Sequence, residues 1–582
     1  MNWNEHWGEL IIEELVRHDT ECFCISPGSR SAPLTVAVAK NPRAKSVIFY
    51  DERAAAYYAL GHARASGRAA VLICTSGTAV ANYLPAVIEA SVDQIPLLVL
   101  TSDRPPELRE TGANQAINQT FLFGTHVRWF FDPGCPCSEF STEALLSTID
   151  HAVSKTLQPL PGPVHLNFPF REPFFENAEK QTNNKVETIT AQKVYVRNTA
   201  FSKVLPDSEI KEMLKNRPES GILSIGRVPA DSLDSLKNLA EELAWPVFAD
   251  VTSGLRLGEN CPNRITYYDQ LLIEDMDSAN WEIEAVWHIG FPPTSKRWLT
   301  HWGKNPATQM VWIADHAERH DQSHNFRWKI ECGIAEFCEQ LVAELKRAER
   351  AEVIPLKTQQ WLQASAKVEA VMEQHFPLYS EKKEIDDFAL SRRLTEIIPE
   401  THGFFIGNSI PVRAVDMLGS GKGTEIPAAL NRSASGIDGL IASACGYSSG
   451  LQRPVSLLIG DLSAIHDLNS FKLLADSPEP VFVVLLNNHG GGIFSFLPVA
   501  KQTDIFETFF GTPHSNDFLS VSEMFGLNYF RPDSISAFVK DYRQAVIENK
   551  STVIEIFTER DKNSQQLEAL AQKLMKCAFE SS

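Results

Sequence analysis

Short apolar segments alternate with amphipathic stretches along this chain, and that alternation constrains the fold more than any other feature of the sequence. In the first third the apolar segments are CFCI, SVIFY, AAVLICT, PLLVLT and VHLNF, with stretches such as DERAAAYYALGHARA between them. Runs this short and apolar are typical of buried strands, and helical stretches between strands are typical of βα units. The first third therefore predicts an α/β domain with a mainly parallel sheet.

The same alternation occurs twice more. The second set of apolar segments is GILSIG, WPVFAD, EAVWHIG and MVWIAD, and the third is GFFIGN, VSLLIG, VFVVLL and STVIEIF. A chain of 582 residues also exceeds what one hydrophobic core supports. We predict an α/β fold with three α/β domains and mainly parallel sheets, at residues 1–180, 200–350 and 375–582. A polar linker is expected at 176–202, and a helical connection at 348–373.

The composition excludes some classes of function. A formal net charge of -19 argues against a general binder of nucleic acid or anionic membranes, so any anionic ligand must be met by local basic residues. No charge-free run approaches the length of a membrane span, and the N-terminal stretch alternates acidic and apolar residues like an amphipathic helix. The ten cysteines fit neither the usual zinc spacings nor a small disulfide framework. We expect a cytoplasmic protein with reduced, mainly buried cysteines.

Polar loops follow the predicted strands of the first set. They are SPGSR at 26–30, DER at 51–53, SGT at 76–78 and SDRP at 102–105. The carboxyl ends of strands in open parallel sheets are where ligands bind. A βα turn needs similar residues, so each loop by itself also fits a purely structural role. The four together favour a binding site.

Two strands of the third set predict a metal site. The strand at 455–459 is followed by Gly-Asp at 460–461, and the strand at 481–486 is followed by Asn-Asn at 487–488. If these strands are parallel neighbours, both polar pairs lie at one edge of the sheet. A carboxylate, an amide oxygen and a backbone carbonyl would leave positions on a hard cation for phosphate oxygens and water, as is usual for Mg²⁺. We therefore expect a metal-diphosphate site here.

This pair of strand ends resembles the GD…NN signature of thiamin-diphosphate enzymes. In that family the aspartate, the second asparagine and a carbonyl two residues later hold the metal. The resemblance thus implies Asp461, Asn488 and Gly490 as ligands of Mg²⁺ or Mn²⁺. Leu462 stands where a third glycine is more familiar, and two unrelated strand-end turns are the alternative for this motif taken alone.

Further motifs extend the resemblance over nearly the whole chain. They are SPGSRS, DERAA, TSGTAVANYLPAV, SDRPPELRETGANQAINQ, NRSASGIDG and NNHGGGIFSFLP. Together they resemble the 2-oxoacid decarboxylase type of thiamin-diphosphate enzyme, and within it the branch that joins 2-oxoglutarate to isochorismate in menaquinone biosynthesis. The resemblance implies a thiamin-diphosphate-binding fold, with an N-terminal pyrimidine-binding domain, a central domain and a C-terminal diphosphate-binding domain.

The resemblance implies roles for residues around the cofactor. Glu52 would be catalytic, since a carboxyl group beside the aminopyrimidine ring promotes the imino tautomer that takes up a proton. Its alternative role is that of an acid in the first turn of a helix capped by Asp51. Ile437 would support the bent cofactor, and its alternative role is that of a core isoleucine. The implied cofactor-binding residues are Glu52, Ile437, Gly460, Asp461, Asn488 and Gly490.

The two implied substrates each carry two carboxylates, which an acidic protein must meet with local positive charge. For any single arginine, a solvated surface charge is the alternative. The implied basic residues are Arg30, Arg104, Lys296, Arg297, Arg413 and Arg432. The implied neutral hydrogen-bonding residues are Ser29, Asn114, Gln115 and Ser409, and an apolar wall would consist of Ile493, Phe494 and Leu497.

The implied activity is that of a transferase. 2-Oxoglutarate would lose CO₂, and the resulting succinyl-semialdehyde carbanion would add to isochorismate in a Stetter-like 1,4-addition, with water excluded. Glu52 of one subunit would serve a cofactor bound largely by another, so a homodimer at least, and a homotetramer, is expected. The rival interpretations are another thiamin-diphosphate 2-oxoacid decarboxylase or acetolactate-type synthase, which needs fewer cationic contacts, and a non-catalytic cofactor-binding protein.

Overall fold

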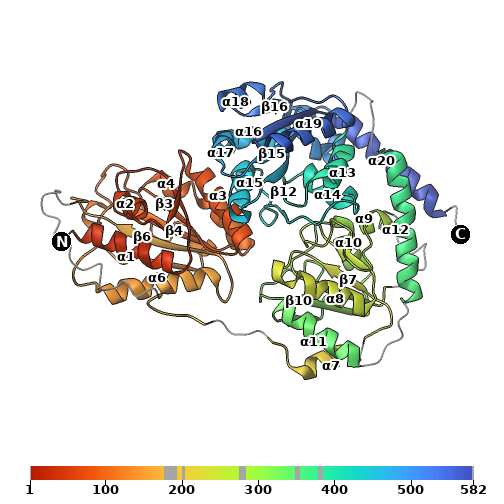
Figure 1. Cartoon of the computed structure of the whole chain (residues 1–582), viewed down its shortest axis with the longest axis horizontal. Coiled ribbons are helices and arrows are strands. Elements are labelled where there is room, and N and C mark those ends of the chain that lie inside the picture. The colour runs from red at the N-terminus through yellow and green to blue at the C-terminus, as the bar shows by residue number, and fades with distance from the viewer. Residues whose placement is uncertain are drawn as a thin grey trace. The chain divides into compact units, whose positions relative to one another are not determined.

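A computed structural model describes residues 2–175, 193–199, 204–215, 217–273, 283–347, 354–377 and 385–579 (Figure 1). The described chain contains three sheets with helices around them. It forms two compact units. The first comprises residues 1–200, 431–455 and 463–481, and the second comprises residues 201–430, 456–462 and 482–582. The predicted α/β class with parallel sheets is confirmed.

The sheet of the first unit has the order β2-β1-β3-β4-β6-β5. Its strands are β1 (Cys22–Ile25), β2 (Lys45–Ile48), β3 (Ala70–Cys74), β4 (Leu97–Asp103), β5 (Trp129–Phe131) and β6 (Pro163–Pro169). The four central strands are buried along their whole length, which explains why β1 and β3 are uniformly apolar. In β6, His165 and Asn167 alternate with apolar residues and are buried as well. Helices α1 (Trp3–Arg17), α2 (Ala32–Lys40) and α6 (Thr142–Leu157) contribute to the core. The edge strand β5 was not predicted.

Helices α3 (Glu52–Ser66) and α15 (Leu440–Leu451) pack closely together within the first unit. A Cβ on Gly61 would lie 2.0 Å from the carbonyl oxygen of Ser443, and a Cβ on Gly446 would lie 1.9 Å from that of Tyr58. Side chains larger than hydrogen therefore do not fit at this crossing. The close packing fixes the helix that begins at Glu52.

Replacing Gly446 with alanine is expected to destabilise the protein by about 1–3 kcal/mol, because the new methyl group meets rigid backbone. Gly303 is the matched control: it lies in α10 (Lys296–Lys304), and a Cβ there would meet nothing within 4 Å. Gly303→Ala should leave stability unchanged or raise it slightly. Thermal unfolding of both variants tests this, and equal melting temperatures would show that the crossing tolerates a methyl group.

The first sheet of the second unit has the order β11-β10-β9-β7-β8. Its strands are β7 (Ile222–Ile225), β8 (Val247–Ala249), β9 (Ala285–Ile289), β10 (Gln309–Ala314) and β11 (Trp328–Glu331). Four of them coincide with the predicted apolar segments. The fifth, β11, was not predicted, because its residues alternate between exposed and buried and include charges. Helices α8 (Leu233–Leu243) and α11 (Ile334–Arg347) complete its core.

The second sheet of this unit carries the predicted metal motif. Its order is β13-β12-β14-β15-β17-β16. The strands are β12 (Gly403–Ile406), β13 (Ala428–Ala429), β14 (Val455–Gly460), β15 (Val481–Asn487), β16 (Asn528–Phe530) and β17 (Thr552–Phe557). Strands β14 and β15 are hydrogen-bonded neighbours, as the metal-site prediction required.

The connections between the sheets are partly described. Most of the predicted linker at 176–202 lies outside the described residues, and 193–199 contain no helix or strand. The predicted helical connection is present as α12 (Leu356–His375), while residues 348–353 lie outside the described part.

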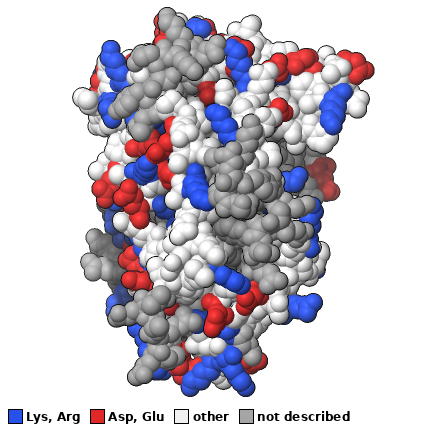
Figure 2. Space-filling model, turned by 90° about the vertical axis from the view of Figure 1, so that its right-hand side faces the viewer, with Lys and Arg blue, Asp and Glu red and all other residues white. Residues whose placement is uncertain are grey.

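The surface charges, the described helices and the cysteines agree with the expectations drawn from the composition. Basic and acidic side chains are interspersed on the face that Figure 2 shows. Among the described helices, none is long and apolar enough to cross a membrane. Cys135 and Cys137 are partly exposed, the other cysteines with described side chains are buried, and all of these are free thiols.

Candidate active site

Asp461 lies at the carboxyl end of β14, where it begins α16 (Asp461–His466). It is 2% exposed. Its Oδ2 accepts hydrogen bonds from the backbone N–H of Gly490, at 3.0 Å, and from His514 Nε2, at 3.1 Å. Because His514 Nδ1 accepts the N–H of Asn516, the proton of the neutral ring is on Nε2. Burial raises the pKa of Asp461, and the hydrogen bonds from Gly490 and Leu462 oppose that shift.

Asn488 follows β15 and is 7% exposed. Its Oδ1 is buried and has no hydrogen-bond partner within the described part of the chain. A buried amide oxygen left without a donor calls for an explanation, and a cation is one that the neighbouring Asp461 supports. The bond between Gly490 and Asp461 joins two of the three implied metal ligands, and Asn488 follows the strand next to that of Asp461 at the same edge of the sheet. The residues therefore fit a divalent cation.

Glycine is required at position 490. Gly490 has a φ of +145°, and a Cβ there would lie 2.1 Å from the carbonyl oxygen of Gly511. No other residue could keep this loop so close to its neighbour. The tight loop explains the glycine-rich sequence after Asn488.

The implied apolar wall follows the metal loop. Ile493 and Phe494 lie in the short helix η8 (Gly492–Phe496) and are partly exposed, while Leu497 is 42% exposed. Phe494 packs edge-on against Phe510, with ring centroids 5.7 Å apart. These side chains are therefore held by packing and still offer apolar surface.

Ser409 and Arg413 lie together at the start of α14 (Ile410–Leu418). Arg413 Nη1 donates to the carbonyl oxygen of Ser409 at 2.6 Å. Ser409 has a φ of +71°, in the left-handed region that residues other than glycine rarely adopt. Such backbone strain is often found at functional sites.

Lys296 and Arg297, the implied substrate-binding residues next to the sheet that contains β9 and β10, are the first two residues of α10. Lys296 is exposed. The guanidinium of Arg297 forms an ion pair with Asp269, which also accepts a hydrogen bond from Ser295 Oγ at 2.5 Å. The charge of Arg297 is thus balanced by a carboxylate that the sequence did not indicate.

In the first unit, Glu52 begins α3, and Asp51 caps that helix. Asp51 accepts the N–H of Arg53 at 2.9 Å, so the capping part of the structural alternative is confirmed. The carboxylate of Glu52 is partly exposed, and its Oε2 accepts a hydrogen bond from Asn82 Nδ2 at 3.1 Å. A capped helix start thus presents a carboxylate whose position Asn82 helps to fix, a contact that the sequence did not predict.

The loop after β1 carries Ser29 and Arg30. Ser29 is exposed, whereas Arg30 is only 4% exposed. Arg30 Nη1 donates to the carbonyl oxygen of Phe170 at 2.9 Å, and its Nη2 pairs with Glu172 at 3.1 Å. The guanidinium is therefore already held by the chain segment after β6.

The loops after β3 and β4 are tied together by a residue that sequence reasoning missed. Gln119 accepts the N–H of Gly77 at 3.0 Å and donates to the carbonyl oxygen of Ser102 at 3.2 Å. This bridge explains how loops distant in sequence share one sheet edge. Of the implied substrate residues in this region, one is partly exposed and two are exposed; they are Arg104, Asn114 and Gln115.

The segment with Arg432 and Ile437 also belongs to the first unit. Arg432 is partly exposed, and Ile437 is 39% exposed, so Ile437 is not a core residue. Next to it, Asp438 Oδ2 accepts the hydroxyl proton of Tyr57 on α3 at 2.5 Å. Helix α3 therefore positions both Glu52 and the residue after Ile437.

Glu89 holds the other side of this segment. It lies on α5 (Leu84–Val92), is 1% exposed, and accepts the N–H groups of Ser433 at 3.0 Å and Ala434 at 2.8 Å. Burial, reinforced by the nearby carboxylate of Asp93, raises the pKa of Glu89 to about 7, against the opposing effect of Arg64. Two hydrogen bonds from adjacent N–H groups to Glu89 fix the backbone next to Arg432.

The raised pKa of Glu89 gives a pH-dependent prediction. The folded protein keeps the Glu89 proton through a range in which the unfolded chain, with an ordinary value of 4.5, has lost it. The proton therefore stabilises the fold fully below pH 4.5, and this contribution, about 3 kcal/mol, is lost as pH rises through about 7. Glu89→Gln lacks it, so its melting temperature should improve relative to the unmodified protein between pH 5 and pH 8. A pH-independent difference would contradict this.

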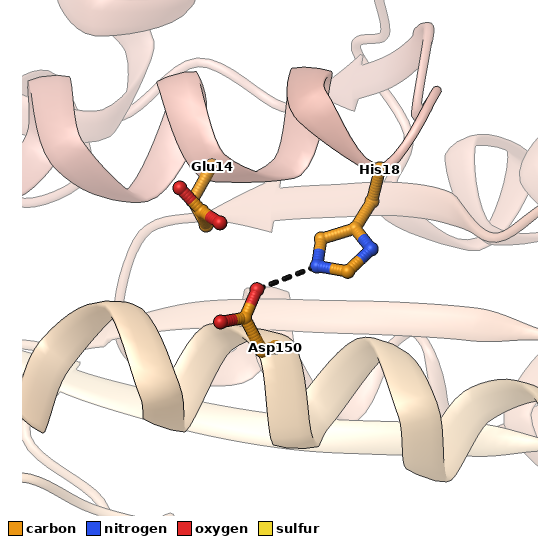
Figure 3. Close-up of side chains that lie close together, drawn as sticks. All are labelled: Glu14, His18 and Asp150. Atoms are coloured by element: carbon orange, nitrogen blue, oxygen red, sulfur yellow. Dashed lines mark hydrogen bonds and ion pairs between the residues drawn. The ribbon is translucent and has the colours of Figure 1, made fainter. Parts of the chain in front are cut away.

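A cluster of three titratable side chains lies on α1, at the C-cap of α1 and on α6 (Figure 3). It consists of Glu14, His18 and Asp150. One carboxylate oxygen of each acid and one ring nitrogen of the histidine lie within 4.8 Å of one another. His18 Nε2 is 2.6 Å from Asp150 Oδ1. Glu14 Oε1 accepts a hydrogen bond from the N–H of Tyr195, and Asp150 Oδ2 accepts one from the N–H of Val196, each at 2.6 Å. The group therefore fastens the segment at 193–199 to the first unit, and burial raises the pKa of Glu14.

Comparison with known families covers most of the chain. Residues 5–122 match the N-terminal TPP binding domain of thiamine pyrophosphate enzymes, residues 186–406 match the middle domain, and residues 426–556 match the C-terminal TPP binding domain.

Three similar proteins are each called 2-succinyl-5-enolpyruvyl-6-hydroxy-3-cyclohexene-1-carboxylate synthase. The protein from Rubrobacter xylanophilus is 41% identical over 564 residues, which cover 96% of each chain. That from Chlorobium phaeobacteroides is 42% identical over 569 residues, covering 96% of this chain and 95% of the relative. That from Chlorobaculum tepidum is 39% identical over 566 residues, with the same coverage. The chain belongs to the 2-succinyl-5-enolpyruvyl-6-hydroxy-3-cyclohexene-1-carboxylate synthase family of thiamin-diphosphate enzymes.

Proposed function

We propose that the protein decarboxylates 2-oxoglutarate and adds the resulting succinyl group to isochorismate by 1,4-addition. The products are CO₂ and 2-succinyl-5-enolpyruvyl-6-hydroxy-3-cyclohexene-1-carboxylate, in menaquinone biosynthesis. The main support is the similarity to synthases of that name over 96% of the chain. Asn488 Oδ1, which is buried and has no hydrogen-bond partner among the residues that the structure describes, supports it as well, because this atom fits the metal that anchors the cofactor.

Thiamin diphosphate, when bound, supplies the carbanion chemistry of the reaction. In our proposal Asp461, Asn488 Oδ1 and the carbonyl oxygen of Gly490 would hold Mg²⁺ or Mn²⁺, and Gly460 would contribute to binding the diphosphate. His514 donates a hydrogen bond to Asp461 and so orients its carboxylate.

Glu52 is the proposed proton-exchanging group. Its carboxylate is accessible and is held by Asn82 at the start of a capped helix. A carboxyl group there can give a proton to a ring nitrogen of the cofactor and take it back. Ile437 is the proposed apolar support of the cofactor, because it is exposed next to a residue that α3 holds.

The side chains proposed to bind the substrates differ in their exposure and in whether they already form ion pairs. Lys296 is exposed, and Arg104 and Arg432 are partly exposed. Arg30 and Arg297 are paired with carboxylates, so a dicarboxylate substrate would have to compete with Glu172 or Asp269 for them. Arg413, Ser29, Asn114, Gln115 and Ser409 would supply further hydrogen bonds. Ile493, Phe494 and Leu497 would form the apolar wall that keeps water from the reacting carbon.

We also propose domains at 1–180, 200–350 and 375–582, a cytoplasmic location and a homo-oligomer, at least a dimer and in the full assembly a tetramer. Oligomerisation is supported by large apolar side chains exposed on the first unit. Ile48 is 52% exposed, Phe121 64% and Tyr50 85%. Such side chains are common where a second subunit covers them.

Release of CO₂ tests the proposal against its rivals. With thiamin diphosphate, Mg²⁺ and 2-oxoglutarate, rapid release should require added isochorismate, and pyruvate should not replace 2-oxoglutarate. Equal release without isochorismate would identify a simple decarboxylase. No turnover of any 2-oxoacid, despite bound cofactor, would identify a non-catalytic binding protein.

A further inference from the structure

A buried carboxylate outside the implied metal ligands contacts one of them. Asp387 is the first residue of α13 (Asp387–Ile397) and is 0% exposed. Its Oδ2 accepts a hydrogen bond from Asn488 Nδ2, at 3.4 Å. Its Oδ1 accepts the hydroxyl proton of Thr558 at 2.6 Å. The carboxylate therefore lies between the end of β15 and the end of β17.

The backbone fixes Asp387 in this position as well. Its N–H donates to Asn563 Oδ1 at 3.0 Å, and the preceding residue, Asp386, caps α13. Thr558, which holds the other carboxylate oxygen, donates its own N–H to the carbonyl oxygen of Asn487 at 3.0 Å. Asp387 is thus held by α13, by the segment after β17 and by α20 (Arg560–Phe579), and cannot turn away from Asn488 without breaking buried bonds.

The chemistry of the two groups determines how the amide of Asn488 is turned. An ionised carboxylate only accepts hydrogen bonds, while an amide has a donating nitrogen and an accepting oxygen. With Nδ2 toward Asp387, Oδ1 points away from it, and Oδ1 is the atom left without a partner in the described residues. A flipped amide would set two oxygens against each other and would offer NH₂, which cannot bind a cation, in place of Oδ1.

We propose that Asp387 is a positioning residue that fixes the amide of Asn488 so that its oxygen faces the metal. This inference rests on the proposed cofactor and metal site. It concerns the affinity for Mg²⁺, so it can be measured without substrate and apart from the reaction.

Two substitutions separate orientation from charge and from packing. Asp387→Asn keeps a carbonyl oxygen that can accept from Asn488 Nδ2, whereas Asp387→Leu keeps the branching at Cγ and has no acceptor. Titration of Mg²⁺ into the full-length protein with saturating thiamin diphosphate should give a Kd raised about 10- to 100-fold for Asp387→Leu, the usual effect of losing a group that orients a ligand. Asp387→Asn should stay within about threefold of the unmodified protein, because the orienting bond survives.

Tyr542→Phe is the matched control. It removes a buried hydrogen bond to Ser456, 2.7 Å long, in the same unit, without touching the contacts of Asn488. Its Kd for Mg²⁺ should be unchanged even if its melting temperature falls. An unchanged Kd in folded Asp387→Leu would overturn the proposal, and so would equal losses in the Asn and Leu variants, which would show that charge alone matters.

If Asp387→Leu does not fold, the exchanged pair provides the test. Asn488→Asp sets two carboxylates against each other and should weaken Mg²⁺ binding. Adding Asp387→Asn should then recover at least tenfold in Kd, because an amide again donates to a ligand whose oxygen faces the metal. No recovery would overturn the proposal. A protein that binds Mg²⁺ in this pattern but forms no product would refute the proposed reaction and leave the role of Asp387 intact.

Discussion

Replacing Glu52 with glutamine is expected to lower kcat by roughly 10²- to 10⁴-fold and to leave the fold intact. Glutamine keeps the shape of the side chain and can still accept the hydrogen bond from Asn82. It cannot exchange a proton with the cofactor, and that exchange is the role we assign to Glu52. The rate should be measured with both substrates saturating, and the fold by circular dichroism and the melting temperature.

Glu143 provides a matched control for this variant. It lies in the first turn of α6, which Ser141 caps, one position further from its cap than Glu52 is from Asp51. If Glu52 served only to complement the helix dipole, both glutamine variants would lose about 0.3–1 kcal/mol of stability and neither would lose activity. Near-normal turnover in Glu52→Gln would remove Glu52 from the mechanism.

Replacing Asp461 with asparagine is expected to abolish metal-dependent binding of thiamin diphosphate. Loss of a group that merely orients a ligand costs 10- to 100-fold in metal affinity, so loss of a charged ligand should cost about 100-fold or more. In the absence of metal and cofactor, the same substitution should not lower the thermal stability of the protein. Burial of Asp461 disfavours its charged form, so the variant should unfold at the same or a higher temperature than the unmodified protein.

Two melting curves of each protein, without and with Mg²⁺ and thiamin diphosphate, check this prediction. The unmodified protein should gain stability from the ligands, since they bind only the folded state, and Asp461→Asn should not. Asp476→Asn is the control. It removes an exposed carboxylate that pairs with Lys472 one helical turn away, and should leave the ligand-dependent gain unchanged. A full gain in Asp461→Asn would place the metal elsewhere.

The sequence predicted those parts of the fold that local patterns determine. Central strands such as β14 and β15 are short and mostly apolar because the sheet is covered on both faces, and their polar ends therefore stand out. The edge strand β11 is partly exposed and mixed in composition, and it was missed for that reason, whereas β5 was missed because it has only three residues. The long helical connection was recognised because helix-forming residues dominate it.

The residues that support the candidate site could not be read from local patterns. Asp387 meets Asn488 across 101 positions of sequence, and Glu89 meets Ala434 across 345. Such contacts depend on the order of strands and helices in space, and that order cannot be inferred from the composition of either segment alone. The same reason applies to the pairs that Arg30 and Arg297 form with Glu172 and Asp269.

For one residue, the structure decided between alternatives that the sequence left open. A lone isoleucine at 437 fits a core as well as a binding site, and only its exposure of 39% excludes the core. For Glu52 the structure shows both features at once, a first-turn acid behind a cap and an accessible carboxylate held by Asn82. Measurement of the rate therefore has to separate its two roles.

The central claim is best tested by identifying the product by mass after incubation with uniformly ¹³C-labelled 2-oxoglutarate, unlabelled isochorismate, thiamin diphosphate and Mg²⁺. The account predicts one labelled CO₂ for each molecule of a new product in which a labelled four-carbon succinyl unit is joined to the isochorismate skeleton. Labelled succinic semialdehyde as the only product, with isochorismate unchanged, would contradict the claim that this site performs the 1,4-addition.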